Sequence, residues 1–358
     1  MVEPQKSRLP IPFLVLAAAA ACSALALYLR VISADWFLAD DFAFLARVQR
    51  PWSWRDVFFP LERRFWWAYR PIGMDTYFYL CFKLFGWNAQ AFFGVTLAAH
   101  AITSLVLYRV GRQLGFNLPA ALSAALLAVS RFPSITNVTK ACTFHYTAAI
   151  LLHLLALSLF VDFSRTRRLS FQVGACGCFA VGLLCNELVI NLPLLLILAS
   201  LFAEGFRLRA SAIRRALRDC WPYFALALLF LVFRYRVIAE MERPYLYVFG
   251  LGWHVAINAL VHLAMIAGDL LYLAAALAVM VLLAAGLLPV RPERRALWAQ
   301  LARVWVLCLS WLLAVLLPLS LFPFPMDRFS MPAQIPAALL FSAALDAAYK
   351  AHAGHGRS

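Results

Sequence analysis

The chain has 358 residues, of which 64% are hydrophobic and only 14% are charged. Soluble domains are about 25% charged and about half apolar, so this composition excludes an ordinary soluble protein and indicates a single transmembrane domain over residues 1–358. The net charge of +15 comes largely from short arginine clusters between apolar runs. Such clusters orient membrane proteins, and they give no support to nucleic-acid binding.

Ten apolar runs approach the length of about 20 residues that crosses a bilayer. They fall near residues 11–31, 90–109, 117–131, 142–163, 169–186, 188–204, 220–239, 269–290, 302–323 and 330–349. With ten spans, the clustered lysines and arginines all lie on one side, which the positive-inside rule makes the cytoplasm. The sequence therefore predicts an all-α, multi-pass protein of a bacterial inner (plasma) membrane, with both termini in the cytoplasm.

Two further apolar stretches, residues 71–85 and 248–266, would reverse this charge pattern if they crossed the membrane. Both are mixed in character, and the second carries His254, Asn258 and His262 at a spacing of four. Amphipathic helices of this kind lie in the membrane interface. We therefore expect residues 33–88 to form a first extracytoplasmic loop that contains juxtamembrane helices.

Four short motifs lie on the predicted outer side. They are Ala39-Asp40-Asp41-Phe42, Tyr69-Arg70-Pro71 at the start of a helix that ends at Gly86, Asn186-Glu187 before Pro193, and Asp327-Arg328-Phe329-Ser330-Met331-Pro332. Charged groups at a membrane edge are costly unless they face water, an opposite charge or a reacting group. Because all four motifs lie on the same predicted side, we expect the chemistry to take place on the extracytoplasmic face.

In this order, the motifs resemble those of the glycosyltransferase C superfamily, which includes the protein O-mannosyltransferases and the lipid A aminoarabinose transferases. The resemblance implies transfer of a sugar from a polyprenyl-phosphate donor to a glycan, lipid or protein acceptor. Asn186 departs from the Lys that members often carry there, and Phe329 replaces the usual Tyr. A non-catalytic member of the same fold is therefore one alternative, and a transporter or flippase of lipid-linked sugars is another.

Such a transfer needs a base for the acceptor hydroxyl and a cation for the leaving phosphate. Asp41 is the first choice for the base and Asp40 the second, because Asp40 suits a helix N-cap. If both face the site, they could share a divalent cation. The candidates for binding the donor phosphate are Arg328, Arg234, Arg236, Lys140 and Arg70, each of which could instead contact lipid head groups. Glu187, His145 and Tyr69 are candidates for lining the acceptor or substrate cavity. Glu187 could equally be the partner of a helix dipole, and His145 could instead be an interfacial histidine whose hydrogen bonds are satisfied.

Overall fold

The computed structural model describes residues 22, 25–26, 29, 33, 36–38, 40–49, 53–58, 69–129, 140–206, 209–238, 252–267, 292–320 and 331–355. All regular elements in this part of the chain are helices, as the sequence predicts. The predicted span near 269–290 lies outside the described residues, and most of the span near 11–31 does as well.

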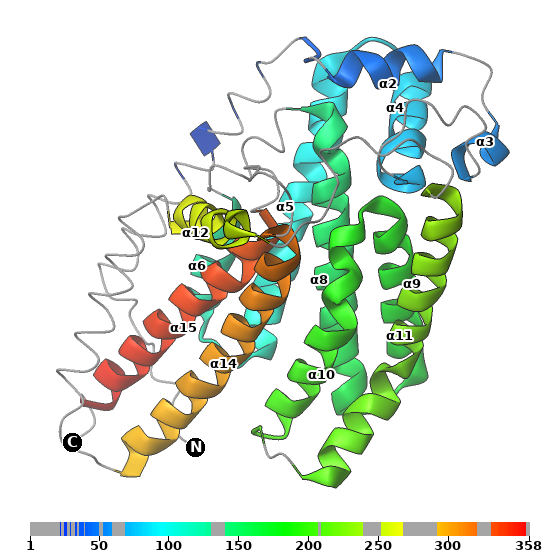
Figure 1. Ribbon diagram of the computed structural model, residues 1–358. Coiled ribbons are helices and arrows are strands. Elements are labelled where there is room, and N and C mark those ends of the chain that lie inside the picture. The colour runs from blue at the N-terminus through cyan, green and yellow to red at the C-terminus, as the bar shows by residue number, and fades with distance from the viewer. Residues whose placement is uncertain are drawn as a thin grey trace.

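Eight of the helices in the described part of the chain form the bundle, and they run side by side in Figure 1. They are α5 (Ala89–Gln113), α6 (Leu118–Val129), α8 (Phe144–Thr166), α9 (Leu169–Cys185), α10 (Leu192–Ala203), α11 (Ala210–Ile238), α14 (Pro292–Ser320) and α15 (Met331–His355). Four stretches among the described residues are long and apolar enough to cross a membrane: Ala89–Gln113, Ala141–Thr166, Ala210–Arg236 and Trp298–Leu317. The integral membrane class is thus supported, whereas the predicted count of ten spans is not confirmed.

Local sequence signals set several of the helix ends. Asn88 caps α5, because its side chain accepts a hydrogen bond from the Ala91 N–H at 3.2 Å. The helix predicted to end at Gly86 does so, and Gly86 adopts a φ of +60°, which glycine tolerates without a Cβ clash. The break between α9 and α10 falls at Asn186–Asn191, and Pro193 lies in the first turn of α10.

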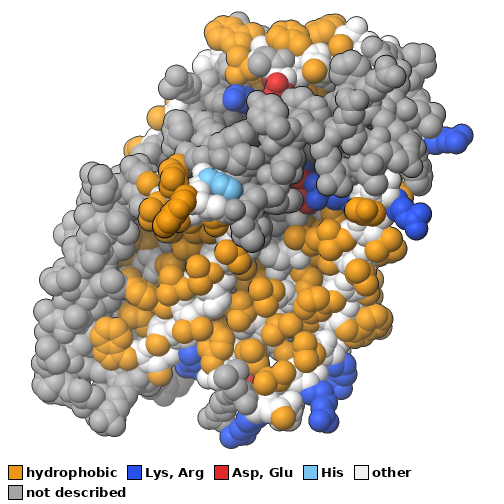
Figure 2. Space-filling model, in the orientation of Figure 1, with side chains coloured by type: hydrophobic (Ala, Val, Ile, Leu, Met, Phe, Trp, Pro, Cys, Tyr) orange, Lys and Arg blue, Asp and Glu red, His pale blue; other side chains and the backbone are white. Residues whose placement is uncertain are grey.

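Ion pairs tie the helices together at one end of the bundle. Arg109 pairs with Asp162 at 2.5 Å, Arg215 pairs with Glu204 at 2.8 Å, and Arg167 contacts Asp219. In Figure 2, lysine and arginine side chains gather along the lower edge of a broad apolar face. This is the arginine-rich end that the sequence assigns to one side of the membrane.

The opposite end carries α2 (Asp40–Val48), α3 (Trp54–Phe58), η2 (Pro71–Thr76) and α4 (Tyr77–Phe85), with α2 lying across the top of Figure 1. A separate cluster of buried aromatic side chains docks these helices on the bundle. Phe44 of α2 stacks on Phe78 of α4 at 4.9 Å between ring centroids, and Tyr77 stacks on Phe144 of α8 at 4.0 Å. The described parts of the predicted outer loop are therefore largely helical, and α2 and α4 are packed against the bundle.

The predicted interfacial segment near 248–266 forms α12 (Trp253–Ala267), which lies across α14 and α15 in Figure 1. Its polar stripe faces inward: Asn258 and His262 are buried, and Asn258 Nδ2 donates to the Ser320 carbonyl at 3.4 Å. Trp253 and Leu260 are exposed. The helix therefore presents its apolar side outward, which suits an interfacial position.

Candidate functional site

Arg70 and Glu187 form the centre of a charged cluster at the outer-loop end of the bundle. Arg70 precedes η2, and Glu187 is the first residue of η4 (Glu187–Asn191), the 3₁₀ turn that leads into α10. Arg70 Nε donates to Glu187 Oε2 at 3.1 Å, and Arg70 Nη2 donates to Glu187 Oε1 at 3.0 Å. The Arg70 side chain is 6% exposed and that of Glu187 is 17% exposed, so this bidentate ion pair is largely shielded from water.

His145, in the first turn of α8, contacts the third nitrogen of the Arg70 guanidinium. Arg70 Nη1 lies 2.7 Å from His145 Nε2, and His145 Nδ1 lies 2.8 Å from the Cys142 carbonyl oxygen. Because a carbonyl only accepts, Nδ1 carries the proton and the neutral imidazole accepts from Arg70 at Nε2. The Arg70 side chain is thereby fixed through all three of its nitrogens.

The absence of a side chain at Gly73 allows η2 to approach α8 and the end of α9. A Cβ atom at Gly73 would lie 2.6 Å from His145 Cβ and 2.8 Å from the Cys185 carbonyl oxygen. Contacts below 3.0 Å do not occur in packed cores without movement of the neighbours. Glycine at this position therefore lets Arg70 reach both His145 and Glu187.

Asp41 connects the outer loop to the start of α8. Its Oδ1 accepts from the Cys142 N–H at 2.7 Å, and its Oδ2 accepts from the Leu38 N–H at 3.1 Å and the Ala141 N–H at 3.4 Å. The Asp41 residue is fully buried, whereas Asp40 is exposed. The Cys142 backbone thus binds Asp41 through its N–H and His145 through its carbonyl.

The positions of Asp40 and Asp41 therefore differ from those that we expected from the sequence. We expected Asp40 to cap the helix and Asp41 to face the cavity, but α2 begins at Asp40 itself. It is Asp41 that binds backbone N–H groups, including that of Leu38 just before the helix. A carboxylate that accepts three backbone hydrogen bonds is held in place by them, and Asp40 is the member of the pair that meets solvent.

Arg234 of α11 completes the cluster. Its Nη2 donates to Glu187 Oε1 at 3.1 Å, and its side chain is 25% exposed. Its Nε is buried and has no hydrogen-bond partner in the described part of the chain. With His145 neutral, the two guanidinium groups and one carboxylate of the described residues give a net charge of 2 − 1 = +1.

The remaining predicted site residues are placed as follows. Tyr69 is buried and packs edge-on against Phe233 of α11, with ring centroids 5.4 Å apart. Lys140 and Arg236 are exposed, while Arg328 and its neighbour Asp327 lie outside the described residues. No three His, Cys, Asp or Glu side chains within the described ranges lie close enough together to hold a metal ion.

A second ion pair lies beside the cluster in the outer loop. Arg47 of α2 pairs with Asp75 of η2 at 3.0 Å. Burial raises the pKa of Asp75 to about 6, although the positive charge of Arg47 opposes this shift. Burial, together with the negative charge of Asp75, raises the pKa of Tyr69 to about 12, so its hydroxyl stays protonated at neutral pH.

The fold and the site define a class: a polytopic helical protein in which α2, η2 and α4 dock over a buried charged cluster at one end of the bundle. Residues 70–239 match the model of the dolichyl-phosphate-mannose-protein mannosyltransferase family. The matched segment begins at Arg70 and includes His145, Glu187 and Arg234. The match covers 170 of the 358 residues, and it agrees with the resemblance to the glycosyltransferase C superfamily that the sequence motifs indicate.

Two crystal structures of ArnT from Cupriavidus metallidurans share the fold. The apo form matches with a TM-score of 0.53 and 17% sequence identity, and the form bound to undecaprenyl phosphate matches with a TM-score of 0.58 and 15% identity. Each match covers 94% of this chain but only 60% or 61% of ArnT, so the chain spans about three fifths of that protein. No curated protein matches the sequence.

Two features of the site could not be predicted from the sequence. Gly73 acts by close packing, and the Cys142 backbone acts through its peptide group. Neither leaves a side-chain pattern in the sequence. The pairing of Arg70 with Glu187 joins residues 117 positions apart, although each residue had been singled out separately.

Proposed function

We propose that this protein is a membrane glycosyltransferase that moves a sugar from a polyprenyl-phosphate donor to an acceptor on the extracytoplasmic face. The observation that carries the proposal is the shielded Arg70–Glu187–Arg234 cluster with its net charge of +1. A phosphodiester donor carries one negative charge and would neutralise the cluster. The ArnT structure with undecaprenyl phosphate supports this class of donor.

In the proposed reaction, the acceptor hydroxyl oxygen bonds to the anomeric carbon of the donor sugar. The bond between that carbon and the phosphate oxygen breaks, and the polyprenyl phosphate leaves with the electron pair. Arg234 would stabilise the leaving phosphate, because its Nε donor is unpaired and its side chain reaches the surface of the cluster. A carboxylate takes the proton from the acceptor hydroxyl.

We assign that carboxylate to Asp40 and give Asp41 a positioning role, which reverses the first expectation. Asp40 is exposed and can meet an acceptor, whereas the Asp41 oxygens are occupied by backbone N–H groups. Glu187 is paired with both arginines, so its role is to orient them. Arg70 acts through Glu187 and His145 as a positioning residue.

The orientation in the membrane is part of the same proposal. The arginine-rich end would face the cytoplasm, with the Arg70–Glu187–Arg234 cluster and α2 on the other side of a bacterial plasma membrane. Cysteine labelling of Arg112→Cys and Trp87→Cys variants with a membrane-impermeant reagent tests this orientation. Labelling of intact cells at position 87, and at position 112 only after lysis, is the expected result.

The activity test measures sugar transfer, or donor hydrolysis, with the purified protein and undecaprenyl phosphate carrying a radiolabelled hexose. Asp40→Asn is expected to lower the rate by about 10²–10⁴-fold, the usual loss on removal of a general base. Arg234→Gln should raise the donor concentration needed for half-maximal rate. Arg112→Gln, at the opposite end of α5, is the control with an unchanged rate.

Two results would contradict the proposal. Full activity of both Asp40→Asn and Asp41→Asn would remove the pair from the reaction. Failure of the wild-type protein to bind undecaprenyl phosphate would remove the donor class, because the charged cluster is assigned to that phosphate.

A further inference from the structure

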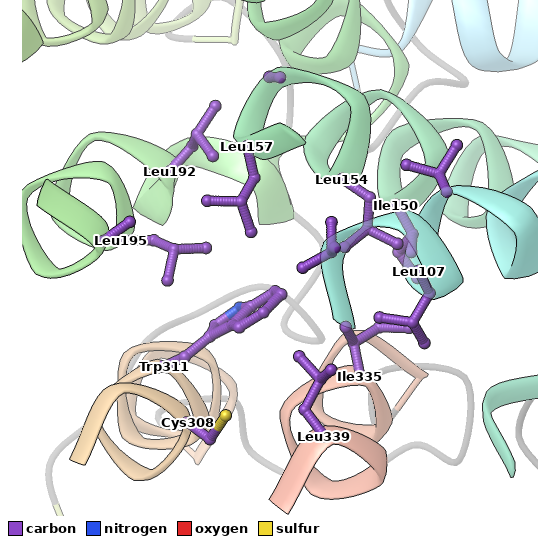
Figure 3. Packing of buried hydrophobic residues seen from close by; sticks show 14 of the residues in the cluster. Leu107, Ile150, Leu154, Leu157, Leu192, Leu195, Cys308, Trp311, Ile335 and Leu339 are labelled. Carbon is purple, nitrogen blue, oxygen red and sulfur yellow. The ribbon is translucent and has the colours of Figure 1, made fainter. Parts of the chain in front are cut away.

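A narrow hollow of about 110 Å³ lies between α5, α8, α10 and α14, toward the arginine-rich end of the bundle. Its deep end is formed by Leu157 of α8, Leu195 of α10 and Trp311 of α14. Figure 3 shows the Trp311 ring projecting from α14 toward these two leucines. The ring stacks on His153 with an interplanar angle of 12° and centroids 5.7 Å apart, so it is held in place and closes the hollow on the side of the charged cluster.

The lining of the hollow changes from apolar to polar along its length. Leu157 and Arg165 are eight residues apart on α8, which corresponds to about 12 Å of helix. The polar lining residues Gln113, Ser164 and Arg165 all lie at the Arg165 end, and the other lining residues are aliphatic or aromatic. The volume of about 110 Å³ is smaller than the roughly 150 Å³ of an apolar cavity that binds benzene. A hollow of this size and length therefore has room for a short segment of one hydrocarbon chain.

Arg165 supplies a positive charge at the polar end of the hollow. It is exposed, and its Nη2 donates to the Gln113 carbonyl oxygen at 2.6 Å. Among the described residues, it makes no ion pair with an acidic side chain. Asp162, one turn earlier on α8, already pairs with Arg109 at 2.5 Å and accepts from Gln113 Nε2 at 2.9 Å. The Arg165 guanidinium, which has five N–H donors, can therefore bind an anion.

Two further groups surround this polar end. A Cβ atom at Gly205 would lie 3.2 Å from Arg303 Nη1, which places the Arg303 guanidinium beside the end of α10, two residues beyond the lining residue Ala203. Gln113 Oε1 is buried and has no hydrogen-bond partner within the part of the chain that the structure describes. An amide oxygen only accepts, so it calls for a donor. The polar end thus offers positive charge and one acceptor.

This arrangement favours an amphiphilic occupant over a small one. A free anion could pair with Arg165 but would leave the apolar deep end empty, and water gains little from apolar walls. A pure hydrocarbon would fill the deep end but would leave Gln113 Oε1 unpaired. Basic pockets between membrane helices are known to bind anionic lipid head groups. A lipid with one negative charge, a hydroxyl group in its head and an extended chain meets every feature of the hollow.

We propose that this hollow binds an anionic glycerophospholipid from the leaflet at the arginine-rich end. A segment of one acyl chain occupies the hollow up to Trp311, the phosphate lies at Arg165, and a head-group hydroxyl donates to Gln113 Oε1. The chain would join the α5–α8 side of the bundle to the α10–α14 side. The site lies at the opposite end of the bundle from the Arg70–Glu187–Arg234 cluster, so the inference goes beyond the proposed function and does not depend on it.

The test uses the full-length protein in lipid nanodiscs and a phosphatidylglycerol probe that carries a photoreactive diazirine at the end of one acyl chain. After irradiation and digestion, mass spectrometry locates the labelled residues. We expect labels on Leu157, Leu195 or Trp311. Arg165→Gln should lower the labelling of these residues by about tenfold, the change in affinity expected from the loss of one charge-assisted contact. Ala199→Phe places a ring in the hollow and should abolish their labelling.

Arg168→Gln is the matched control. It removes the same charge three residues away, from an exposed position outside the lining of the hollow, so the labelling of the deep residues should not change. The melting temperature of each variant is measured alongside. Because Arg165 is exposed, the Arg165→Gln variant should fold and decides the question even if the bulky Ala199→Phe variant does not.

Each of three other results would overturn the proposal. Labels confined to exposed side chains such as Leu105 and Leu313 would mean that the probe meets only the outer surface of the bundle. Equal losses for Arg165→Gln and Arg168→Gln would mean that the general charge of this end attracts the lipid. Equal labelling of the deep residues by a phosphatidylcholine probe, which carries no net charge, would mean that the hollow does not select an anionic lipid.

Discussion

Arg70→Lys tests whether the cluster depends on the shape of the guanidinium group or only on its charge. The lysine ammonium keeps the positive charge, but it is a single nitrogen and cannot contact both Glu187 oxygens and His145 at once. In the wild type, Arg70 makes all three contacts at 2.7–3.1 Å, with 6% of its side chain exposed. The substitution therefore removes about two hydrogen bonds that involve a charged group.

Hydrogen bonds to charged groups contribute about 1.5–3 kcal/mol each. Arg234 still pairs with Glu187 at 3.1 Å and offsets part of the loss. We therefore expect the free energy of unfolding to fall by about 3 kcal/mol, in an estimate that takes the lower part of this range. At roughly 2 °C per kcal/mol for a chain of this size, the melting temperature should fall by about 6 °C.

The assay is thermal unfolding in detergent micelles, followed by intrinsic fluorescence. Arg112→Lys is the matched control, because Arg112 is exposed on α5, and exposed substitutions usually change stability by less than about 0.5 kcal/mol. A fall of less than about 2 °C for Arg70→Lys would refute the reasoning, since it would mean that one charge at this position is enough.

Three further predictions concern the packing and the charges around the cluster. Gly73→Ala should lower the free energy of unfolding by about 1–3 kcal/mol, because the new Cβ clashes with His145 and Cys185. Gly94 has open space around it, so Gly94→Ala should not destabilise the protein. Equal melting temperatures for the two variants would contradict this prediction. For Asp75, the folded pKa of about 6 exceeds its ordinary value of 3.8, so its contribution to stability is complete below about pH 4 and is lost as the pH rises to about 6. Hydrogen exchange of residues 71–76, corrected for the intrinsic rate, should therefore speed up over that range, and Asp75→Asn should flatten the profile. Asn88→Ala should cost about 1 kcal/mol by removing the cap of α5, measured by the same thermal unfolding, and Asn88→Asp should retain most of the stability.

The helical elements could be predicted well from the sequence, because apolar runs indicate the helices and the polar residues between the runs indicate where the helices end. The helix from Pro71 to Phe85 and the break between α9 and α10 at Asn186–Asn191 were placed correctly. The predicted span near 220–239 lies within α11, except for its last residue, and the helix itself begins earlier, at Ala210. The polar first turns of that helix lack the apolar character that defined the run, so hydropathy alone did not include them.

Four of the candidate residues lie together in the structure, but their geometry could not be predicted. From the sequence, Arg70 and Arg234 are candidates for the donor phosphate, and Glu187 and His145 are candidates for the substrate cavity. In the structure, they contact one another. Pairing between helices depends on the register in which they pack, and a single sequence carries no record of that register.

The choice between Asp40 and Asp41 shows the same limit. A pair of adjacent carboxylates indicates that their side chains point in different directions, but it does not say which one points inward. That depends on the aromatic cluster of Phe44, Phe78 and Tyr77, which sets how α2 is rotated on the bundle. The sequence therefore defines the two alternatives, and the packing determines that Asp41 is the buried carboxylate and Asp40 the exposed one.

The separation of Arg70 from Glu187 along the chain has a consequence for biogenesis. The two residues are 117 positions apart, and ribosomes add about 5–20 residues per second. Arg70 thus emerges on the order of ten seconds before its carboxylate partner is made. Through that interval the Arg70 guanidinium lacks its carboxylate partner, although the aromatic contacts of α2 and α4 with α8 become available earlier. Completion of the charged cluster is therefore a late event in synthesis, even though Arg70 itself is made early.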